Sequence, residues 1–409
     1  MTNISVLDIR LYGEPIGTLT HMGGDKTLFA FTDTYIENKD RPVLGLGFKD
    51  QSGELITEFK PYGTQVMPFF SNLLPEGYMR TYLAERAGVN PVREFFLLWA
   101  LGQDLPGAIT VTPADGEQWP PSSDHELEAK DDQDNKSRNG ALRFSLAGVQ
   151  IKFSAVDHES GGLTIPVNGL GGSWIVKLPS SSYEGVPENE FSMMTLARLV
   201  GINVPAIKLV DVESIENLPS GISGLGKQAF AIERFDRLSD GSAVHIEDFA
   251  QIFGIYPKKK YEKASMRNIA SVIAVEGSTE DIAELIRRLT FNTLIGNADM
   301  HLKNWSMIYL DRRTATIAPA YDFVSTIAYM PDKSAALKFS RTKRFSEYSM
   351  DELSHLAAKA RLPEKLVVES AQETIDLFRQ HWAAEKLNLP LDGNAVKSIE
   401  RHIQTLSIG

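Results

Sequence analysis

The sequence predicts an α+β protein with two lobes and an additional N-terminal region, on three observations. Runs of alternating apolar and polar residues, typical of β-strands, fill much of residues 141–236. After about residue 237, apolar residues recur instead at helical spacing. The length of 409 residues exceeds what one ordinary core supports, so two or three domains are expected.

The N-terminal region, residues 1–112, is predicted to be an α+β subdomain. Residues 4–60 show short strand patterns divided by Gly and Asp turns, and residues 66–103 are rich in apolar and helix-forming residues. The composition then changes, because residues 113–140 contain eight acidic residues, three basic residues and three prolines. Such a segment can bury little apolar surface and is predicted to form an acidic linker or surface loop.

The two lobes are expected to span residues 141–236 and 237–409. In the first, one helix at about 187–200 interrupts four strand patterns, which lie at 141–153, 172–178, 205–212 and 227–235. In the second, residues 279–295 keep helical spacing except where Asn292 and Thr293 interrupt the apolar stripe. A strand-rich lobe followed by a helical lobe suits a nucleotide bound between them.

Composition excludes several classes of protein. The net charge of −11 argues against a surface that coats DNA generally. The absence of cysteine excludes disulfides, thiol catalysis and zinc sites built on thiolates. The N-terminus lacks the basic start and apolar core of a signal peptide, and no stretch reaches the roughly 18 apolar residues of a membrane helix. The protein is therefore predicted to be cytoplasmic and not associated with a membrane.

The strongest chemical signal is a polar loop, residues 296–304, between the helical pattern and a strand-like run at 305–310. Asp299 and Asn304 in this loop have the separation of two groups in the kinase catalytic loop: the acid that orients the substrate hydroxyl and the amide that holds a metal ion. Lys303 could neutralise the γ-phosphate as charge develops. The alternative interpretation is a helix C-terminus whose Asn and Asp side chains act as caps.

A second acidic residue, Asp322, follows Asn304 by 18 positions. Two antiparallel strands joined by a turn at 311–313 would bring Asp322 back beside the polar loop. There its carboxylate could bind Mg²⁺, which prefers oxygen ligands and bridges nucleotide phosphates. Asp322 alone is a weak signal. It becomes a candidate metal ligand only because it follows the Asp299–Asn304 loop at this separation in the sequence.

Lys177 lies in an apolar strand pattern, where an inward-pointing lysine would be a costly buried cation unless it were paired. Glu190 on the following helix is the predicted partner, although Glu188 stays a competing one. Such a pair resembles the ion pair between a strand lysine and a helix glutamate that positions ATP phosphates in kinases. Either residue alone is more often a surface charge.

Two further segments carry weaker signals. Small residues at Ala147 and Gly148 would let backbone amides approach a phosphate closely. Phe235, where strands give way to helices, could form an apolar wall beside adenine. An ordinary strand end with a salt-bridged Arg234 explains the same residues equally well.

Taken together, these segments resemble the HipA family of bacterial toxin kinases. The resemblance covers nearly the whole chain. The matching segments are residues 72–76, 145–150 with Lys152, 175–179, 189–190, 201–205, 233–237, 299–304 and 321–322.

The resemblance implies a protein-kinase-like two-lobed fold with an extra N-terminal α+β subdomain and an all-helical C-terminal lobe. It implies a serine/threonine kinase that uses ATP and Mg²⁺, with Asp299 as catalytic acid–base, and with Asn304 and Asp322 as metal ligands. Met300 stands where a small residue often sits, which affects the pocket for the substrate hydroxyl. The residues implied to hold the nucleotide are Ala147, Gly148, Val149, Gln150, Lys152, Lys177, Glu190, Glu233, Phe235, His301, Asn304 and Tyr321.

The resemblance further implies a toxin that arrests growth by phosphorylating a translation component such as an aminoacyl-tRNA synthetase. A small helix-turn-helix antitoxin would neutralise it and link it to operator DNA. Ser145 falls on the serine that family members autophosphorylate, and a phosphate there would compete with ATP for the same amides and lysines.

Two other functions are compatible with parts of this pattern. Aminoglycoside-type kinases share the separation between Asp and Asn, so a small-molecule phosphotransferase is one alternative. A DNA-binding corepressor without kinase activity is another, although binding alone would not need the whole catalytic set. A basic cluster is interpreted as a solvated face, or alternatively as a patch that contacts DNA phosphates. Its members are Lys338, Arg341, Lys343 and Arg344.

Overall fold

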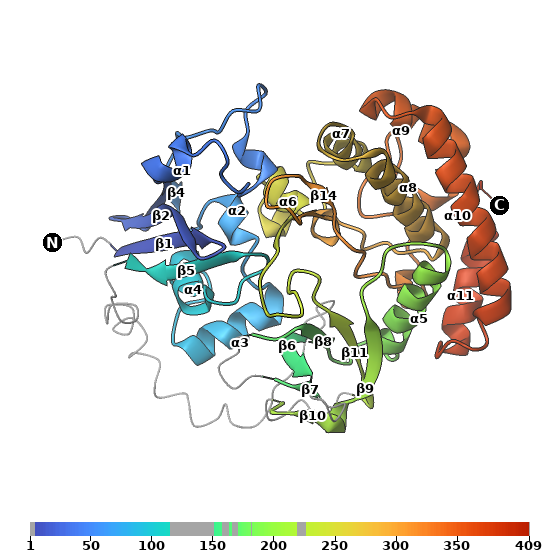
Figure 1. Cartoon of the computed structure of the whole chain (residues 1–409). Coiled ribbons are helices and arrows are strands. Elements are labelled where there is room, and N and C mark those ends of the chain that lie inside the picture. Colours follow the sequence, from blue (N-terminus) through green and yellow to red (C-terminus); the bar gives the residue numbers. More distant parts are fainter. Residues whose placement is uncertain are drawn as a thin grey trace.

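The computed structural model contains three β-sheets, and its helices gather mainly at the C-terminal side (Figure 1). It describes residues 5–114, 151–157, 163–165, 171–180, 182–218 and 226–408, without the side chains of Tyr78 and Arg86. The proposed phosphate-loop residues 147–150, the proposed autophosphorylation site Ser145 and nearly all of the proposed linker lie outside the described residues. The division into domains at 112, 140 and 236 therefore stays a prediction.

The N-terminal subdomain is built on a five-stranded antiparallel sheet whose strand order is β4-β3-β2-β1-β5. Every second residue of β1 is buried, as expected for a sheet with one face on a core. The strands predicted before residue 32 and the helices predicted within 66–103 are confirmed. The elements are β1 (Ser5–Leu11), β2 (Glu14–Met22), β3 (Lys26–Phe31), β4 (Tyr62–Gly63), β5 (Ile109–Pro113), α2 (Pro68–Ser71), α3 (Gly77–Ala87) and α4 (Glu94–Leu101).

The strand prediction is wrong for most of residues 32–60. Thr32 ends the strand pattern because its hydroxyl accepts the Tyr35 N–H and so caps a short helix, α1 (Asp33–Glu37). The chain then crosses the subdomain through a 3₁₀ turn, η1 (Leu46–Phe48). Alternating apolar residues in this stretch pack into the core from irregular backbone. A period of two in the sequence cannot distinguish such backbone from a β-strand.

The second sheet has six strands in the order β10-β7-β6-β8-β11-β9, and a helix covers each of its faces. In the central strand β11, Phe230 and Ile232 pack with α5, whereas Ala229 and Ala231 share a core with Met79 of α3. The N-terminal subdomain thus supplies the helix on the second face. The elements are β6 (Lys152–Asp157), β7 (Leu163–Thr164), β8 (Trp174–Lys177), β9 (Ile207–Asp211), β10 (Ile215–Glu216), β11 (Gln228–Glu233) and α5 (Val186–Leu199).

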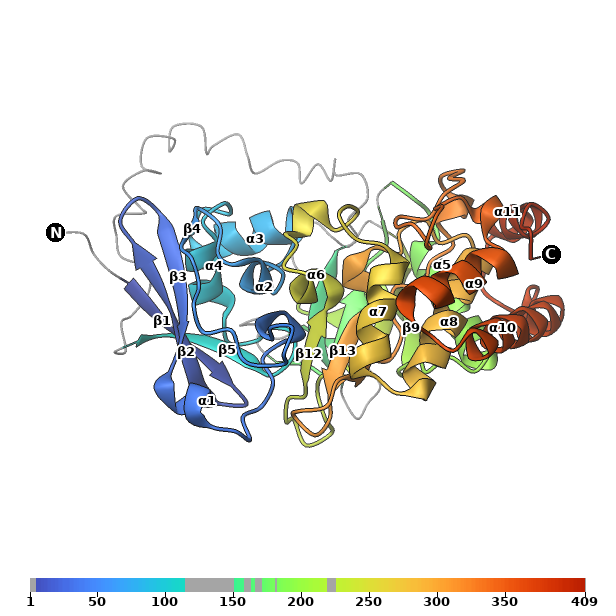
Figure 2. The same ribbon diagram turned by 90° about the horizontal axis from the view of Figure 1, so that it is seen from above.

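The C-terminal lobe is mainly helical, but it also contains a three-stranded antiparallel sheet, so the expectation of an all-helical lobe is corrected. Figure 2 shows β12 and β13 between the N-terminal subdomain and the outer helices. None of the helices in the described part of the chain is both long and apolar enough to span a membrane. The elements are β12 (His245–Asp248), β13 (Ser306–Tyr309), β14 (Thr316–Ile317), α6 (Phe249–Ile252), α7 (Met266–Glu276), α8 (Thr279–Leu294), α9 (Met350–Ala360), α10 (Glu364–Glu385) and α11 (Gly393–Ile403).

Buried polar contacts join the N-terminal subdomain to this small sheet. The Leu46 N–H donates to Glu247 Oε1 at 2.8 Å, and the Tyr309 hydroxyl donates to the same oxygen. Glu247 is fully buried. Burial raises the pKa of Glu247 to about 8, although the hydrogen bonds from Tyr309 and Leu46 favour the ionised form. The folded protein therefore holds a proton here that the unfolded chain releases near its ordinary pKa of 4.5.

This proton makes stability depend on pH. A raised pKa in the folded state gives stability that is present below the unfolded pKa and is lost as the pH rises through about 8. Between about pH 6 and about pH 8.5, the melting temperature of the wild type should fall relative to that of Glu247→Gln. For a chain of 409 residues the expected shift is about 1–2 °C for each kcal/mol of unfolding free energy that is lost. Differential scanning calorimetry of both proteins measures it, and parallel curves would contradict this role of Glu247.

Candidate active site

The polar loop 296–304 begins at a glycine that no other residue could replace without strain. Gly296 ends α8 with φ +66°, and a Cβ there would lie 2.5 Å from the Ile327 side chain. Ile327 belongs to the 3₁₀ turn η7 (Thr326–Ala328), and its N–H donates to the Gly296 carbonyl at 3.3 Å. The glycine therefore lets the loop pack directly against the segment that follows Asp322.

Asn297, to which the sequence assigned no role, organises this loop. Its Nδ2 donates to Asn292 Oδ1 at 2.8 Å and to the Asp322 carbonyl at 3.2 Å. Its Oδ1 accepts the Asp299 N–H at 3.0 Å. Asn292 interrupts the apolar stripe of α8 because its buried side chain holds Asn297 in place, and that interruption was the signal available in the sequence.

Asp322 comes back to the loop as the sequence predicted. The strands β13 and β14 are antiparallel on either side of the turn at 311–313. Asp322 has φ +59°, a left-handed conformation that costs a non-glycine residue about 1–3 kcal/mol. Its carbonyl is held by Asn297, as described above. Such strain concentrates at functional sites because the surroundings must enforce it.

Lys177 joins the two lobes electrostatically. Its Nζ donates to Glu190 Oε1 at 2.5 Å and to Asp322 Oδ1, and no contact to Glu188 accompanies them among the described residues. Burial disfavours the charged lysine, but the two carboxylates outweigh burial and raise the pKa of Lys177.

The two carboxylates respond differently to the shared lysine. Burial opposes the charge of Asp322, yet Lys177 and Lys152 hold the pKa of Asp322 well below its usual range. Burial raises the pKa of Glu190 to about 7, because Lys177 compensates it only in part while the Asp322 carboxylate repels it. Two lysines, Lys177 and Lys152, thus face the two carboxylates, and the stronger stabilisation falls on Asp322.

Asp299 is accessible to solvent, and its Oδ1 accepts a hydrogen bond from the Tyr261 hydroxyl at 2.7 Å. Partial burial raises the pKa of Asp299, whereas the Tyr261 hydrogen bond and Lys260 lower it in part. A raised pKa suits a general base. Tyr261 occupies a position on the carboxylate that a substrate hydroxyl would need, and sequence reasoning missed this residue.

The side-chain oxygens of Asn304 and Asp322 are of the type that Mg²⁺ binds. The Oδ1 atom of Asn304 is buried and has no hydrogen-bond partner among the described residues. Together with the Asp322 carboxylate it offers two oxygen ligands, and Mg²⁺ typically takes one or two protein oxygens and completes its shell with phosphates and water. His301 is buried beside them, and burial lowers its pKa to about 3, so its ring stays neutral.

Aromatic residues lie where the strand-rich lobe meets the helical lobe. The rings of Phe235 and Tyr321 lie 5.8 Å apart, and the Tyr321 hydroxyl donates to the Lys303 carbonyl at 2.9 Å. The exposed Glu233 already uses its N–H for the Ala206 carbonyl, so that donor is not available to adenine. Burial lowers the pKa of Lys152; the Asp322 carboxylate opposes this shift, and the Lys177 cation adds to it.

The alternative interpretation of residues 233–237 is partly correct too. Arg234 forms ion pairs with Asp236 at 2.9 Å and with Asp104 of the N-terminal subdomain at 3.2 Å.

The basic cluster after residue 337 forms ion pairs on the surface. Arg341 binds Asp351 and Glu352, and Arg344 approaches Glu347 at 3.5 Å. These pairs favour the solvated face, and contact with DNA stays a prediction.

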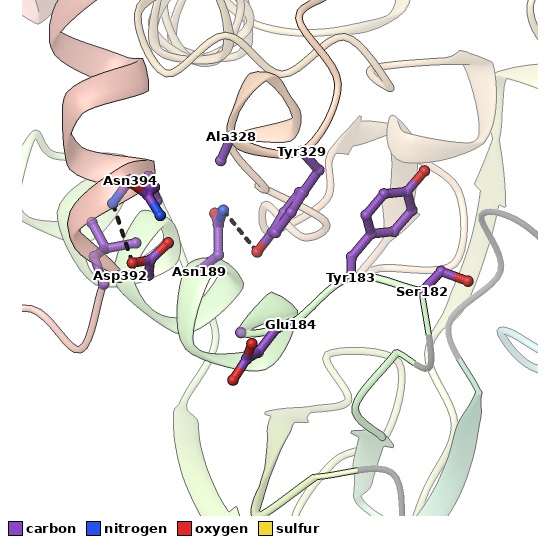
Figure 3. A pocket seen from close by; sticks show the side chains of 11 residues that line it. Ser182, Tyr183, Glu184, Asn189, Ala328, Tyr329, Asp392 and Asn394 are labelled. Carbon is purple, nitrogen blue, oxygen red and sulfur yellow. Dashed lines mark hydrogen bonds between the residues drawn. The ribbon is translucent and has the colours of Figure 1, made fainter.

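A cavity of about 280 Å³ borders the site between the start of α5, η7 and the start of α11 (Figure 3). Asn189 lies in its wall, and its side chain bonds both the N–H and the carbonyl of Ser325. Asn189 thus fixes the segment after Asp322, while its neighbour Glu190 binds Lys177. None of the residues that line the cavity belongs to the predicted catalytic set.

Comparison with known proteins identifies the family of this chain. A family model described as the HipA N-terminal domain matches residues 7–112, and one described as the HipA-like C-terminal domain matches residues 144–382. The chain belongs to the HipA family. The family resemblance read from the sequence is thereby confirmed.

Relatives of this HipA-family chain are named as kinases. It is 56% identical to the putative kinase Y4dM of Sinorhizobium fredii, across 100% of this chain and 98% of that protein. It is 28% identical to the serine/threonine-protein kinase toxin HipA of Shewanella oneidensis, across 65% of this chain and 64% of that protein. A solved complex of Shewanella HipA, HipB and operator DNA matches with a TM-score of 0.72 and 24% identity, covering 98% of this chain and 95% of that one. The predicted α+β, kinase-like fold is confirmed.

Proposed function

We propose that this protein is an ATP- and Mg²⁺-dependent serine/threonine protein kinase that acts as a toxin. The observation that carries the proposal is the position of Lys177, which bonds both Glu190 and Asp322 beside the loop of Asp299 and Asn304. This is the arrangement of lysine, helix glutamate and metal-binding aspartate that kinases need in place together.

Each residue has a separate task in phosphoryl transfer. Asp299 orients the attacking hydroxyl of the substrate and accepts its proton, after the Tyr261 hydroxyl has moved aside. Lys177 and Lys152 bind phosphate oxygens, and Lys303 neutralises charge that develops on the γ-phosphate. Asn304 and Asp322 would hold Mg²⁺, which would offset the negative charge of the nucleotide phosphates. Phe235 and Tyr321 would border the adenine.

The proposed partners follow from the family. The similar structure contains HipA, HipB and operator DNA, which supports a helix-turn-helix antitoxin that neutralises this chain and links it to an operator. The proposed substrate is a translation component such as an aminoacyl-tRNA synthetase. Phosphorylation of Ser145 by the enzyme itself is proposed to switch it off, because about −1.5 to −2 added charges would compete with the ATP phosphates.

Phosphoproteomics of cells that express the wild type or Asp299→Asn tests the proposal. The wild type should stop growth and produce new phosphoserine or phosphothreonine, including phosphate on its own Ser145, and the variant should do neither. Growth arrest without new protein phosphorylation would instead favour a small-molecule phosphotransferase. Normal growth with an unchanged phosphoproteome would contradict the toxin kinase.

A further inference from the structure

The segment 72–76 of the N-terminal subdomain reaches the catalytic loop from outside the two kinase lobes. It connects α2, which packs on α6 of the helical lobe, to α3, which packs on the six-stranded sheet. Asn72 fixes the segment by donating to the Ile255 carbonyl at 2.8 Å. The segment therefore contacts structure that belongs to both lobes, at the place where they meet.

Glu76 at the end of this segment binds two lysines of the helical lobe. Its Oε1 lies 3.0 Å from Lys303 Nζ and its Oε2 lies 3.0 Å from Lys260 Nζ. Lys303 also donates to the Asn72 carbonyl at 3.0 Å, and Asp248 lies 4.0 Å from it. The Lys303 ammonium is thus held mainly by the N-terminal subdomain, although it belongs to the catalytic loop.

We propose that Glu76 is a positioning residue of the kinase: the N-terminal subdomain supplies it to fix Lys303 in the loop that also carries Asp299. This inference rests on the proposed function. The kinase site is then composite, because a residue from outside both lobes completes its catalytic loop.

The physical reason lies in the lysine side chains. A lysine is a flexible chain with a compact charge, so its ammonium needs a partner to stay in one place. Lys303 and Lys260 would also repel each other without the carboxylate between them. Burial opposes the charge of Glu76, yet the two lysines lower its pKa to about 2. The carboxylate that holds both lysines is therefore ionised at neutral pH.

Phosphotransfer kinetics of Glu76→Gln provide the first test. The amide removes the charge and one of the two oxygen acceptors, so kcat should fall by about 10- to 100-fold, the usual cost of misplacing a catalytic group. The KM for Mg·ATP should change much less, because Lys177 and Lys152 are untouched. The matched control is Glu276→Gln. Glu276 Oε2 lies 2.9 Å from Lys49 Nζ, so this substitution also removes an ion pair between the helical lobe and the N-terminal subdomain, but away from the catalytic loop. Its kinetics should equal those of the wild type.

A double-mutant cycle shows whether Glu76 acts through Lys303. In a Lys303→Met background, Glu76→Gln should cause no further loss of kcat, since the two residues then act as one unit. A full additional loss in that background would overturn the proposal. So would a Glu76→Gln protein as active as the Glu276→Gln control.

A readout without catalysis separates this inference from the proposed function. Limited acetylation with acetic anhydride, followed by mass spectrometry of the nucleotide-free protein, reports how accessible each lysine is. Lys303 should react several-fold faster in Glu76→Gln than in the wild type or in Glu276→Gln. Equal reactivity of Lys303 in all three proteins would refute the proposal that Glu76 holds Lys303. A wild type that transfers no phosphate, but whose Lys303 is protected by Glu76, would refute only the kinase function.

Discussion

Replacing Asp299 by asparagine is expected to lower phosphoryl transfer by roughly 10²–10⁴-fold, the usual contribution of a positioned general base. Asparagine keeps the size of the side chain and can still accept the Tyr261 hydrogen bond, so the loop should keep its shape. The substitution removes the negative charge and, with it, the ability to take the substrate proton. Transfer of labelled γ-phosphate from ATP in the presence of Mg²⁺ measures the effect.

The control for Asp299 is Glu262→Gln, which changes the net charge equally on an exposed residue beside Tyr261. This variant should retain wild-type turnover and the same melting temperature. If Asp299→Asn also keeps its turnover, Asp299 is not the catalytic base and the assignment of the loop fails.

The second large effect is expected for the metal ligands. Asn304→Ala and Asp322→Ala each remove one oxygen ligand and should weaken Mg·ATP binding by at least about tenfold, a loss that even outer-shell partners of metals commonly cause. Isothermal titration calorimetry with ATP in the presence and absence of Mg²⁺ separates the affinity that depends on the metal from the affinity for ATP alone. The variants should differ from the wild type mainly when Mg²⁺ is present.

Asp322 needs a second variant because of its left-handed backbone at φ +59°. Alanine is disfavoured in that conformation, whereas asparagine tolerates it. Asp322→Asn therefore removes the charge without the backbone cost, and it should still lose Mg²⁺-dependent affinity. Wild-type affinity in both Asn304→Ala and Asp322→Asn would mean that the metal binds elsewhere.

Much of the fold could be predicted because periodicity is a local property of the chain. The strands at 172–178, 205–212 and 227–235 and the helices within 187–200 and 279–295 follow directly from spacing. The strand prediction failed in residues 32–60, where a capping Thr32 and tertiary packing override the alternation. The sheet in the C-terminal lobe was only partly foreseen, since β12 lies far along the chain from its partner β13.

The proposed catalytic residues were likewise chosen by type and spacing, whereas spacing could not identify their hydrogen-bond partners. Glu188 and Glu190 were both candidates for Lys177, and only the packing of α5 on β11 selects Glu190. No motif marks Tyr261, and the only signal for Asn297 was the interruption of the apolar stripe at Asn292. Both act through hydrogen bonds to residues of a loop whose shape appears only in three dimensions.

The sequence by itself predicted most of the strands and helices around the proposed site, the HipA-family resemblance and the proposed catalytic set of Lys177, Asp299, Asn304 and Asp322. These are properties of spacing and residue type, which the chain carries whether or not it is folded. Only the tertiary structure decided that Lys177 bridges two carboxylates and that Glu76 holds Lys303 across 227 positions of sequence. The physical reason is that a charge near the interior takes whichever partner folding brings within hydrogen-bond reach, and the cost of leaving it unpaired makes that choice unique.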